Sequence, residues 1–76
     1  MCLAVPAVVL QINLDRTALV DILGVQRVVA LDLLPQAVVG DYVLVHAGFA
    51  IELISAETAE ETLAFFAEFP ELAEGL

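Results

Sequence analysis

Two side chains of this chain have the greatest capacity for metal or nucleophilic chemistry: Cys2 and His46, its single cysteine and single histidine. A small residue at position 2 normally allows removal of the initiator methionine, which leaves Cys2 with a free α-amino group beside its thiol. The protonated amine favours the neighbouring thiolate, the form of cysteine that binds soft metals. The alternative is that Cys2 is only a small buried hydrophobic residue, the usual fate of a free cysteine.

His46 ends the run YVLVH and precedes Ala47 and Gly48, so we expect it at a strand end or in a tight turn. Imidazole and thiolate together suit iron, zinc or copper. A structural zinc site needs four ligands, so two protein ligands must be completed by a partner, a second copy or small molecules on the metal. If Cys2 and His46 meet, the chain is therefore expected to carry a metal species; otherwise His46 is an ordinary surface or core histidine.

The remaining residues argue against an autonomous enzyme. The single serine, Ser55, lies where a helix cap is expected, and there is no lysine, so a Ser-His-Asp triad would have to form against the local structure. The glycines, at positions 24, 40, 48 and 75, match no dinucleotide-binding or Walker spacing. Paired carboxylates occur on a solvated helix face, which is a poor environment for acid-base catalysis. We predict that the chain is not an enzyme.

Length and composition indicate one small folded unit with apolar surface to spare. The chain has 76 residues, of which 62% are hydrophobic, so disorder is not expected. A chain this short cannot bury all of its apolar surface. The exposed remainder is either a partner surface or scattered small residues such as alanine.

The net charge of −9 is confined to the second half of the chain. Residues 1–27 are neutral overall, whereas residues 28–76 contain every excess acid and no lysine or arginine. Nucleic acid and anionic membrane surfaces are therefore not expected as partners. No segment resembles a membrane span or a secretory signal. Together with the single cysteine, this predicts a cytoplasmic protein.

Short apolar runs separated by turn signals predict a mainly β first part. The runs cover residues 7–14, 17–22, 25–31, 42–46 and 49–54, a spacing typical of a small antiparallel barrel or sandwich. Alternation is clearest in Ala18, Val20 and Ile22. It also predicts that residues 49, 51 and 53 share a face opposite Glu52. In 25–31 both faces are apolar, which fits either a covered strand or a surface that binds a partner.

From residue 55 the apolar period becomes helical, so we divide the single domain into a barrel (1–54), a helix (55–70) and a tail (71–76). Ser55 and Thr58 compete as the N-cap. Ala59, Leu63 and Phe66 form one apolar stripe that Phe69 would continue, and Pro70 would stop the helix. The acidic residues lie off this stripe, so the helix is predicted to cover the barrel with its acidic side in water, or else to dock another protein.

Three sequence blocks closely resemble the HypC/HybG/HupF family of hydrogenase assembly chaperones. They are MCLAVP at residues 1–6, GVQR-x-V at 24–29 and VGDYVLVHAGFA at 39–50, in this order along nearly the whole chain. The resemblance implies a small OB-like antiparallel β-barrel with a C-terminal α-helix. Ala7 departs from a frequent family glycine, and the short segment 32–39 leaves the client hydrogenase open.

The resemblance also implies a role in assembling nickel-iron hydrogenases. Family members bind a HypD-type iron-sulfur scaffold protein and, through it, a HypE-type cyanide-donating protein. They help to hold iron that receives cyanide and carbon monoxide ligands, and deliver it to the hydrogenase large-subunit precursor. Cys2 and His46 match the family's iron-site positions, and Cys2 would also contact the partner. Pro6, Arg27 and Phe49 match positions with a structural or partner-contact role.

Two other functions remain compatible with the same residues. One is an interaction adaptor without a metal role, in which Cys2 is structural. The other is a homodimer that binds zinc through two cysteines and two histidines. If the chaperone interpretation holds, the near-neutral first half is expected to dock on the scaffold, with the acidic helix directed away.

Overall fold

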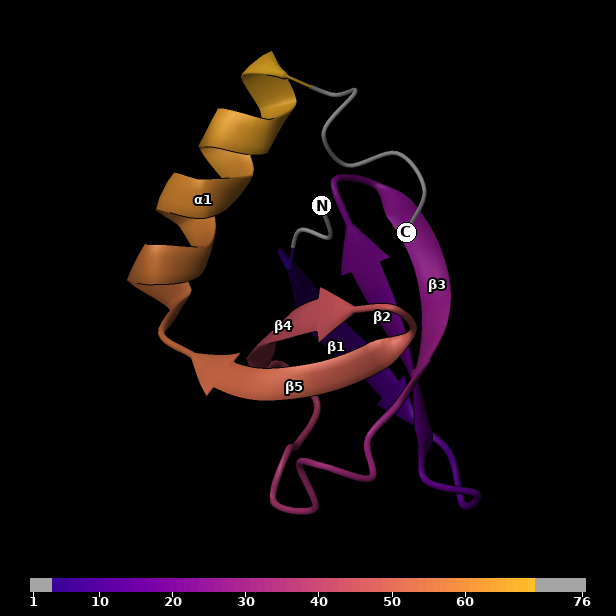
Figure 1. Cartoon of the computed structure of the whole chain (residues 1–76). Helices are drawn as coiled ribbons and strands as arrows, with labels where there is room; N and C mark the ends of the chain where they lie inside the picture. The colour runs from indigo at the N-terminus through magenta and orange to yellow at the C-terminus, as the bar shows by residue number, and fades with distance from the viewer. Residues whose placement is uncertain (1–3, 70–76) are drawn as a thin grey trace.

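The computed structural model describes residues 4–69, which form a closed five-stranded barrel followed by one helix (Figure 1). The elements are β1 (Val5–Ile12), β2 (Thr17–Ile22), β3 (Val25–Ala30), β4 (Tyr42–His46), β5 (Phe49–Ile54) and α1 (Ala56–Glu68). The strand order is β1-β2-β3-β5-β4, and each neighbouring pair is antiparallel except β3 with β5. The prediction of a small barrel with a C-terminal helix is confirmed. The first strand begins and ends two residues earlier than predicted.

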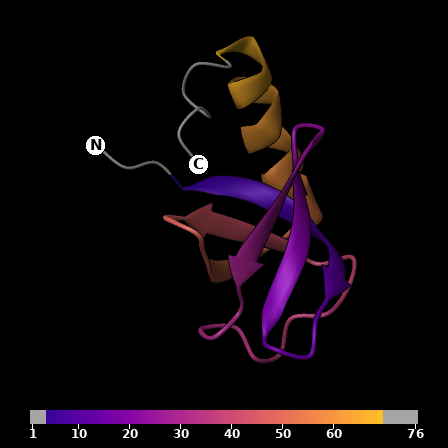
Figure 2. The same cartoon turned by 90° about the vertical axis from the view of Figure 1, so that its right-hand side faces the viewer.

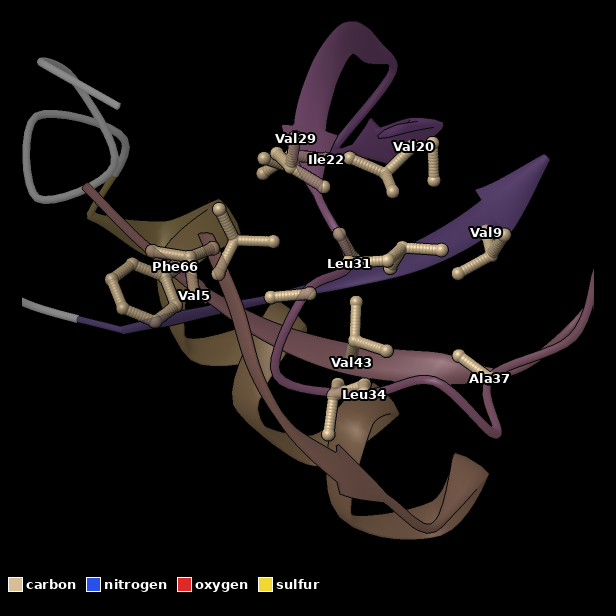
Figure 3. Close-up of a cluster of buried hydrophobic side chains, with 14 residues drawn as sticks. Val5, Val9, Val20, Ile22, Val29, Leu31, Leu34, Ala37, Val43 and Phe66 are labelled. Carbon is tan, nitrogen blue, oxygen red and sulfur yellow. The ribbon is translucent and has the colours of Figure 1, made fainter. Parts of the chain in front are cut away.

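The barrel is filled by small and medium-sized apolar side chains. Val5, Val9, Val20 and Val43 are almost completely buried, and Figure 3 shows them in one cluster with side chains from the other elements. Burying a valine fully contributes roughly 1.5 kcal/mol or more to the free energy of folding. The predicted inward face of β2 is confirmed, because its alternate residues Ala18, Val20 and Ile22 are all buried.

A β-bulge in β5 overturns the predicted alternation of that strand. Val45 is opposite Ala50 and Leu44 is opposite Glu52, so Ile51 is an extra residue without a partner. A bulge reverses the inward and outward positions beyond it. Ala50 is buried and Leu53 packs against the core, whereas Ile51 is exposed. The prediction that residues 49, 51 and 53 share one face is therefore wrong.

Apolar side chains on both faces of β3 are exposed within residues 4–69. Val25, on the face of Val29, is 52% exposed, and Val28, on the outer face, is 62% exposed. Only the end of the strand enters the core, where Val29 is buried. The sequence left open whether this segment is a covered strand or an exposed surface, and in the structure it is an exposed surface.

Ser55, rather than Thr58, caps α1. The Ser55 side-chain oxygen accepts a hydrogen bond from the Thr58 backbone N–H at 3.1 Å, and Ser55 has the extended backbone typical of an N-cap. Thr58 lies inside the first turn, where its hydroxyl accepts a hydrogen bond from the Ser55 hydroxyl. The helix thus begins directly after β5. The connection is so short that it restricts the direction of the helix relative to the barrel.

The apolar stripe of α1 packs on β1 and β4 (Figure 1). Ala59 and Phe66 are buried and Leu63 packs against the core. The acidic residues predicted to lie off the stripe are all exposed: Glu57, Glu60, Glu61 and Glu68. Phe69 does not continue the stripe as predicted, because the helix ends at Glu68 and Phe69 is 42% exposed. Pro70, the predicted stop, lies outside the described residues. Within residues 4–69 no helix is long and apolar enough to cross a membrane.

Replacing the cap tests this account of the helix start. We expect Ser55→Ala to lower the free energy of unfolding by about 1 kcal/mol, because the Thr58 N–H loses its acceptor. Ser55→Asp, which keeps an acceptor oxygen, is the matched control and should retain most of the stability. Urea denaturation followed by circular dichroism measures both. Equal losses in the two variants would contradict the capping role.

Candidate functional site

A tight turn at the end of β4 holds His46. His46 is directly opposite Phe49, and the two residues between them, Ala47 and Gly48, have positive φ angles of 53° and 85°. Two positive φ angles in a two-residue hairpin loop define a type I′ turn, whose twist matches that of the flanking strands. The prediction that His46 lies at a strand end beside a tight turn is confirmed. His46 is half-buried.

The same turn closes the barrel against β3. The Ala30 backbone N–H donates a hydrogen bond to the Gly48 carbonyl at 2.9 Å. Ala30 opposite Phe49 is the one residue pair that joins β3 to β5. Because this contact fixes the turn to the end of another strand, His46 has a defined position and does not move with a free loop.

The start of β1 lies beside the end of β4 (Figure 2). Val5 is opposite Val45 in the antiparallel pair, so Ala4 and His46 are the next residues along the two strands. Cys2 lies outside the described residues, but it is separated from Ala4 by only one residue. Two residues of extended chain span at most about 7 Å. The register therefore puts Ala4, two residues after Cys2, beside His46.

The structure places the other three predicted site residues in different environments. Phe49 is 45% exposed on the turn opposite His46. Arg27 is exposed on β3, three residues before Ala30, which is roughly 10 Å along the strand. Pro6 is fully buried in β1, opposite Leu44. Its side chain thus packs in the interior of the fold.

The position of Pro6 follows from its lack of an N–H group. At Pro6, β1 pairs with β4 on one side, and its pairing with β2 begins only at Val8. A proline is tolerated in a strand where its nitrogen faces no partner. Pro6 thus helps to fix the path of β1 from its first residues, next to the segment that leads to Cys2.

Among the described residues, His46 is the one side chain at this site that binds metals strongly. Within residues 4–69, no group of three or more histidine, cysteine, aspartate or glutamate side chains could hold a metal ion. An imidazole from His46 can supply one ligand or hold a proton, and further ligands must come from elsewhere.

Sequence reasoning missed Ala30, whose N–H anchors the turn. A backbone donor carries no signal in the type of its side chain, so only the folded topology identifies it.

Comparison with known proteins decides the family. The sequence model of the HupF/HypC family matches residues 1–66, which is most of the chain and includes every residue of the site. The chain belongs to the HupF/HypC family. This confirms the resemblance seen in the three sequence blocks.

Several HupF/HypC relatives are similar over most of their length. The hydrogenase maturation factor HypC of Cupriavidus necator is 50% identical over 68 residues, which cover 90% of this chain and 76% of that protein. HypC of Helicobacter hepaticus is 45% identical over 67 residues, covering 87% and 78%. The hydrogenase maturation factor HybG of Escherichia coli K12 is 38% identical over 69 residues, covering 83% and 84%.

The turn that positions His46 is testable by substitutions at its two loop residues. Gly48→Ala should lower the free energy of unfolding by about 1 kcal/mol, because no atom crowds the site and the cost comes from the positive φ angle alone. Ala47→Asn should raise it by up to about 1 kcal/mol, since asparagine tolerates this conformation better than alanine. Urea denaturation measures both changes. A loss of stability in Ala47→Asn would show that the turn is not type I′.

Proposed function

We propose that this chain is a maturation chaperone for nickel-iron hydrogenases that carries iron with cyanide and carbon monoxide ligands as transient cargo. Cys2 and His46 are the proposed iron ligands, and the protein itself is not an enzyme. The observation that carries the proposal is the register that puts His46 beside the start of β1, in a family whose relatives are named hydrogenase maturation factors.

An incomplete ligand set is what a carrier needs. A thiolate from Cys2 and an imidazole from His46 would leave most of the iron coordination sphere to cyanide, carbon monoxide and a partner. The cargo is then stable while bound to the chaperone, yet only two protein bonds have to break on transfer. His46 is only half-buried, which is consistent with a site at the surface, where cargo can pass between proteins.

The proposed partners are a HypD-type iron-sulfur scaffold protein, with a HypE-type cyanide-donating protein acting through it, and the hydrogenase large-subunit precursor. The proposed contacts are Cys2, Arg27 and Phe49, together with the segment of β1 that Pro6 positions. The charge distribution supports docking through the barrel, because both arginines lie in residues 1–27 while α1 exposes Glu57, Glu60, Glu61 and Glu68. An acidic partner surface meets less repulsion on the barrel side than on α1. The compartment proposed for this assembly is the cytoplasm.

The proposal is tested by purifying the chain under anaerobic conditions with its co-expressed maturation partners. Native mass spectrometry should show an added iron mass, and infrared spectroscopy should show bands in the cyanide and carbonyl stretching regions. Cys2→Ala should remove both signals, and His46→Ala should weaken them, because each variant deletes one proposed ligand. Gln36→Ala, at an exposed loop position, is the control and should retain them.

Two results would replace this function by another. A partner complex that forms without iron and does not depend on Cys2 would identify an interaction adaptor. Stoichiometric zinc in a dimer that a chelator dissociates would identify a zinc-binding homodimer. Either result would contradict the iron-carrier proposal.

A further inference from the structure

β3 has a free edge. β2 pairs with it from Val25 to Ala30, but on the other side β5 reaches it only at Ala30. Within residues 4–69, no strand pairs with this second side of residues 25–29. Figure 1 shows β3 curving along the outside of the barrel, and Figure 2 shows the β2–β3 hairpin extending beyond the other strands.

The hairpin geometry identifies the backbone groups at this edge. Leu23 and Gly24 form a two-residue turn with φ angles of 52° and 87°, so Ile22 and Val25 are a hydrogen-bonded pair. Hydrogen bonding alternates along an antiparallel strand, and Gln26 and Val28 therefore direct their N–H and C=O groups away from β2. The Ala30 N–H follows the same alternation, because it binds the Gly48 carbonyl and not β2.

Exposed strand edges are commonly blunted by charged side chains, above all lysine, by proline or by a bulge. Of these features, the β3 edge has only one charged residue, Arg27. Residues 25–30 contain no lysine or proline, and their register with β2 is continuous. On the outer face, Val28 is 62% exposed and Phe49, paired with Ala30, is 45% exposed. The backbone edge and an apolar strip thus lie side by side.

Arg27 gives the edge a charge preference. It lies between Gln26 and Val28, is exposed, and has no acidic side chain opposite it, since its partner in β2 is Val20. An added strand would bring one of its own side chains next to Arg27. Opposite charges at neighbouring strand positions are favourable, so a carboxylate is the best fit there.

A second copy of this chain fits the edge poorly. An antiparallel pair of β3 strands that uses Gln26 and Val28 of both copies would place Arg27 directly opposite Arg27 of the other copy. Like charges in this position are destabilising. Each copy also carries a net charge of −9.

We infer that the free edge of β3 binds an extended segment of a protein partner, which adds a strand through the backbone of Gln26 and Val28. The segment carries an apolar side chain against Val28 and Phe49 and a carboxylate beside Arg27. Because the β4–β5 turn occupies the end of the edge, the added strand ends near His46. For the identity of the partner, the scaffold protein, the inference rests on the proposed function.

Residue-resolved amide hydrogen exchange tests the inference on the full chain. In the free protein, the Gln26 and Val28 amides should exchange fast and the Arg27 amide slowly. Adding the purified HypD-type scaffold should slow the Gln26 and Val28 amides by about tenfold or more. Slow exchange of these two amides in the concentrated free protein would instead identify a second copy as the occupant and overturn the inference.

The chain offers a matched pair of charge variants, because it has two arginines. Arg27→Glu should weaken scaffold binding about tenfold, since an opposite-charge pair becomes a like-charge pair. Arg16→Glu changes the net charge equally, but in the turn between β1 and β2, and should change binding less than about twofold. Equal effects of the two variants would show only a general charge effect and contradict a carboxylate beside Arg27.

The outcomes separate this inference from the proposed function. If the scaffold binds and the Gln26 and Val28 amides stay fast, the strand-addition inference is wrong and the proposed function stands. If the scaffold does not bind, the proposed partner is wrong, and the same exchange measurement is made with the hydrogenase large-subunit precursor. Protection of these amides by the precursor would support an added strand, and protection by neither protein would overturn it.

Discussion

The hydrogen bond from the Ala30 N–H to the Gly48 carbonyl joins the two halves of the sheet. Within residues 4–69, the pair formed by Ala30 and Phe49 is the one place where β3 meets β5, so this contact closes the barrel. The Gly48 carbonyl belongs to the β4–β5 loop, which bends through two residues with positive φ, a conformation that glycine adopts at position 48 without strain. Barrel closure and the placement of His46 thus depend on the same four-residue segment, 46–49.

A barrel formed by so short a chain has a small core, and part of its apolar surface stays exposed. Ala7, Ala18 and Ala50 are completely buried, and such small residues let the strands close tightly. The larger apolar residues that do not fit remain outside, among them Val28 and Phe49 beside the closing bond. The surface beside the closing contact is therefore apolar, whereas α1 exposes four glutamates and carries no base. This division is suited to a protein that must bind partners and then release them.

Much of the fold could be predicted because its signals are local. β2 was located by the alternation of Ala18, Val20 and Ile22, and the hairpins by their glycine turns. The helical period located α1. The bulge at Ile51 could not be predicted, because one extra residue leaves no mark in an apolar run. Phe69 was misplaced because the apolar pattern continues past the helix end.

The site was only partly predictable for a related reason. Cys2 and His46 were identified from their chemistry and from the family blocks, and the register explains how His46 comes near the chain start. The roles of Ala30 and of the β3 edge depend on backbone groups, which every residue type carries. Only the strand pairing shows which of these groups are bonded and which are free.

The central proposal is that Cys2 and His46 form one iron site, and one measurement tests their proximity directly. Because Cys2 is the only cysteine, a nitroxide label attached to its thiol reports its position without further engineering. The account predicts strong paramagnetic broadening of the NMR signals of His46, Ala47 and Gly48, and little at Leu14 and Arg16 in the turn that follows the other end of β1. Unbroadened signals at His46, with broadening elsewhere on the barrel, would contradict it.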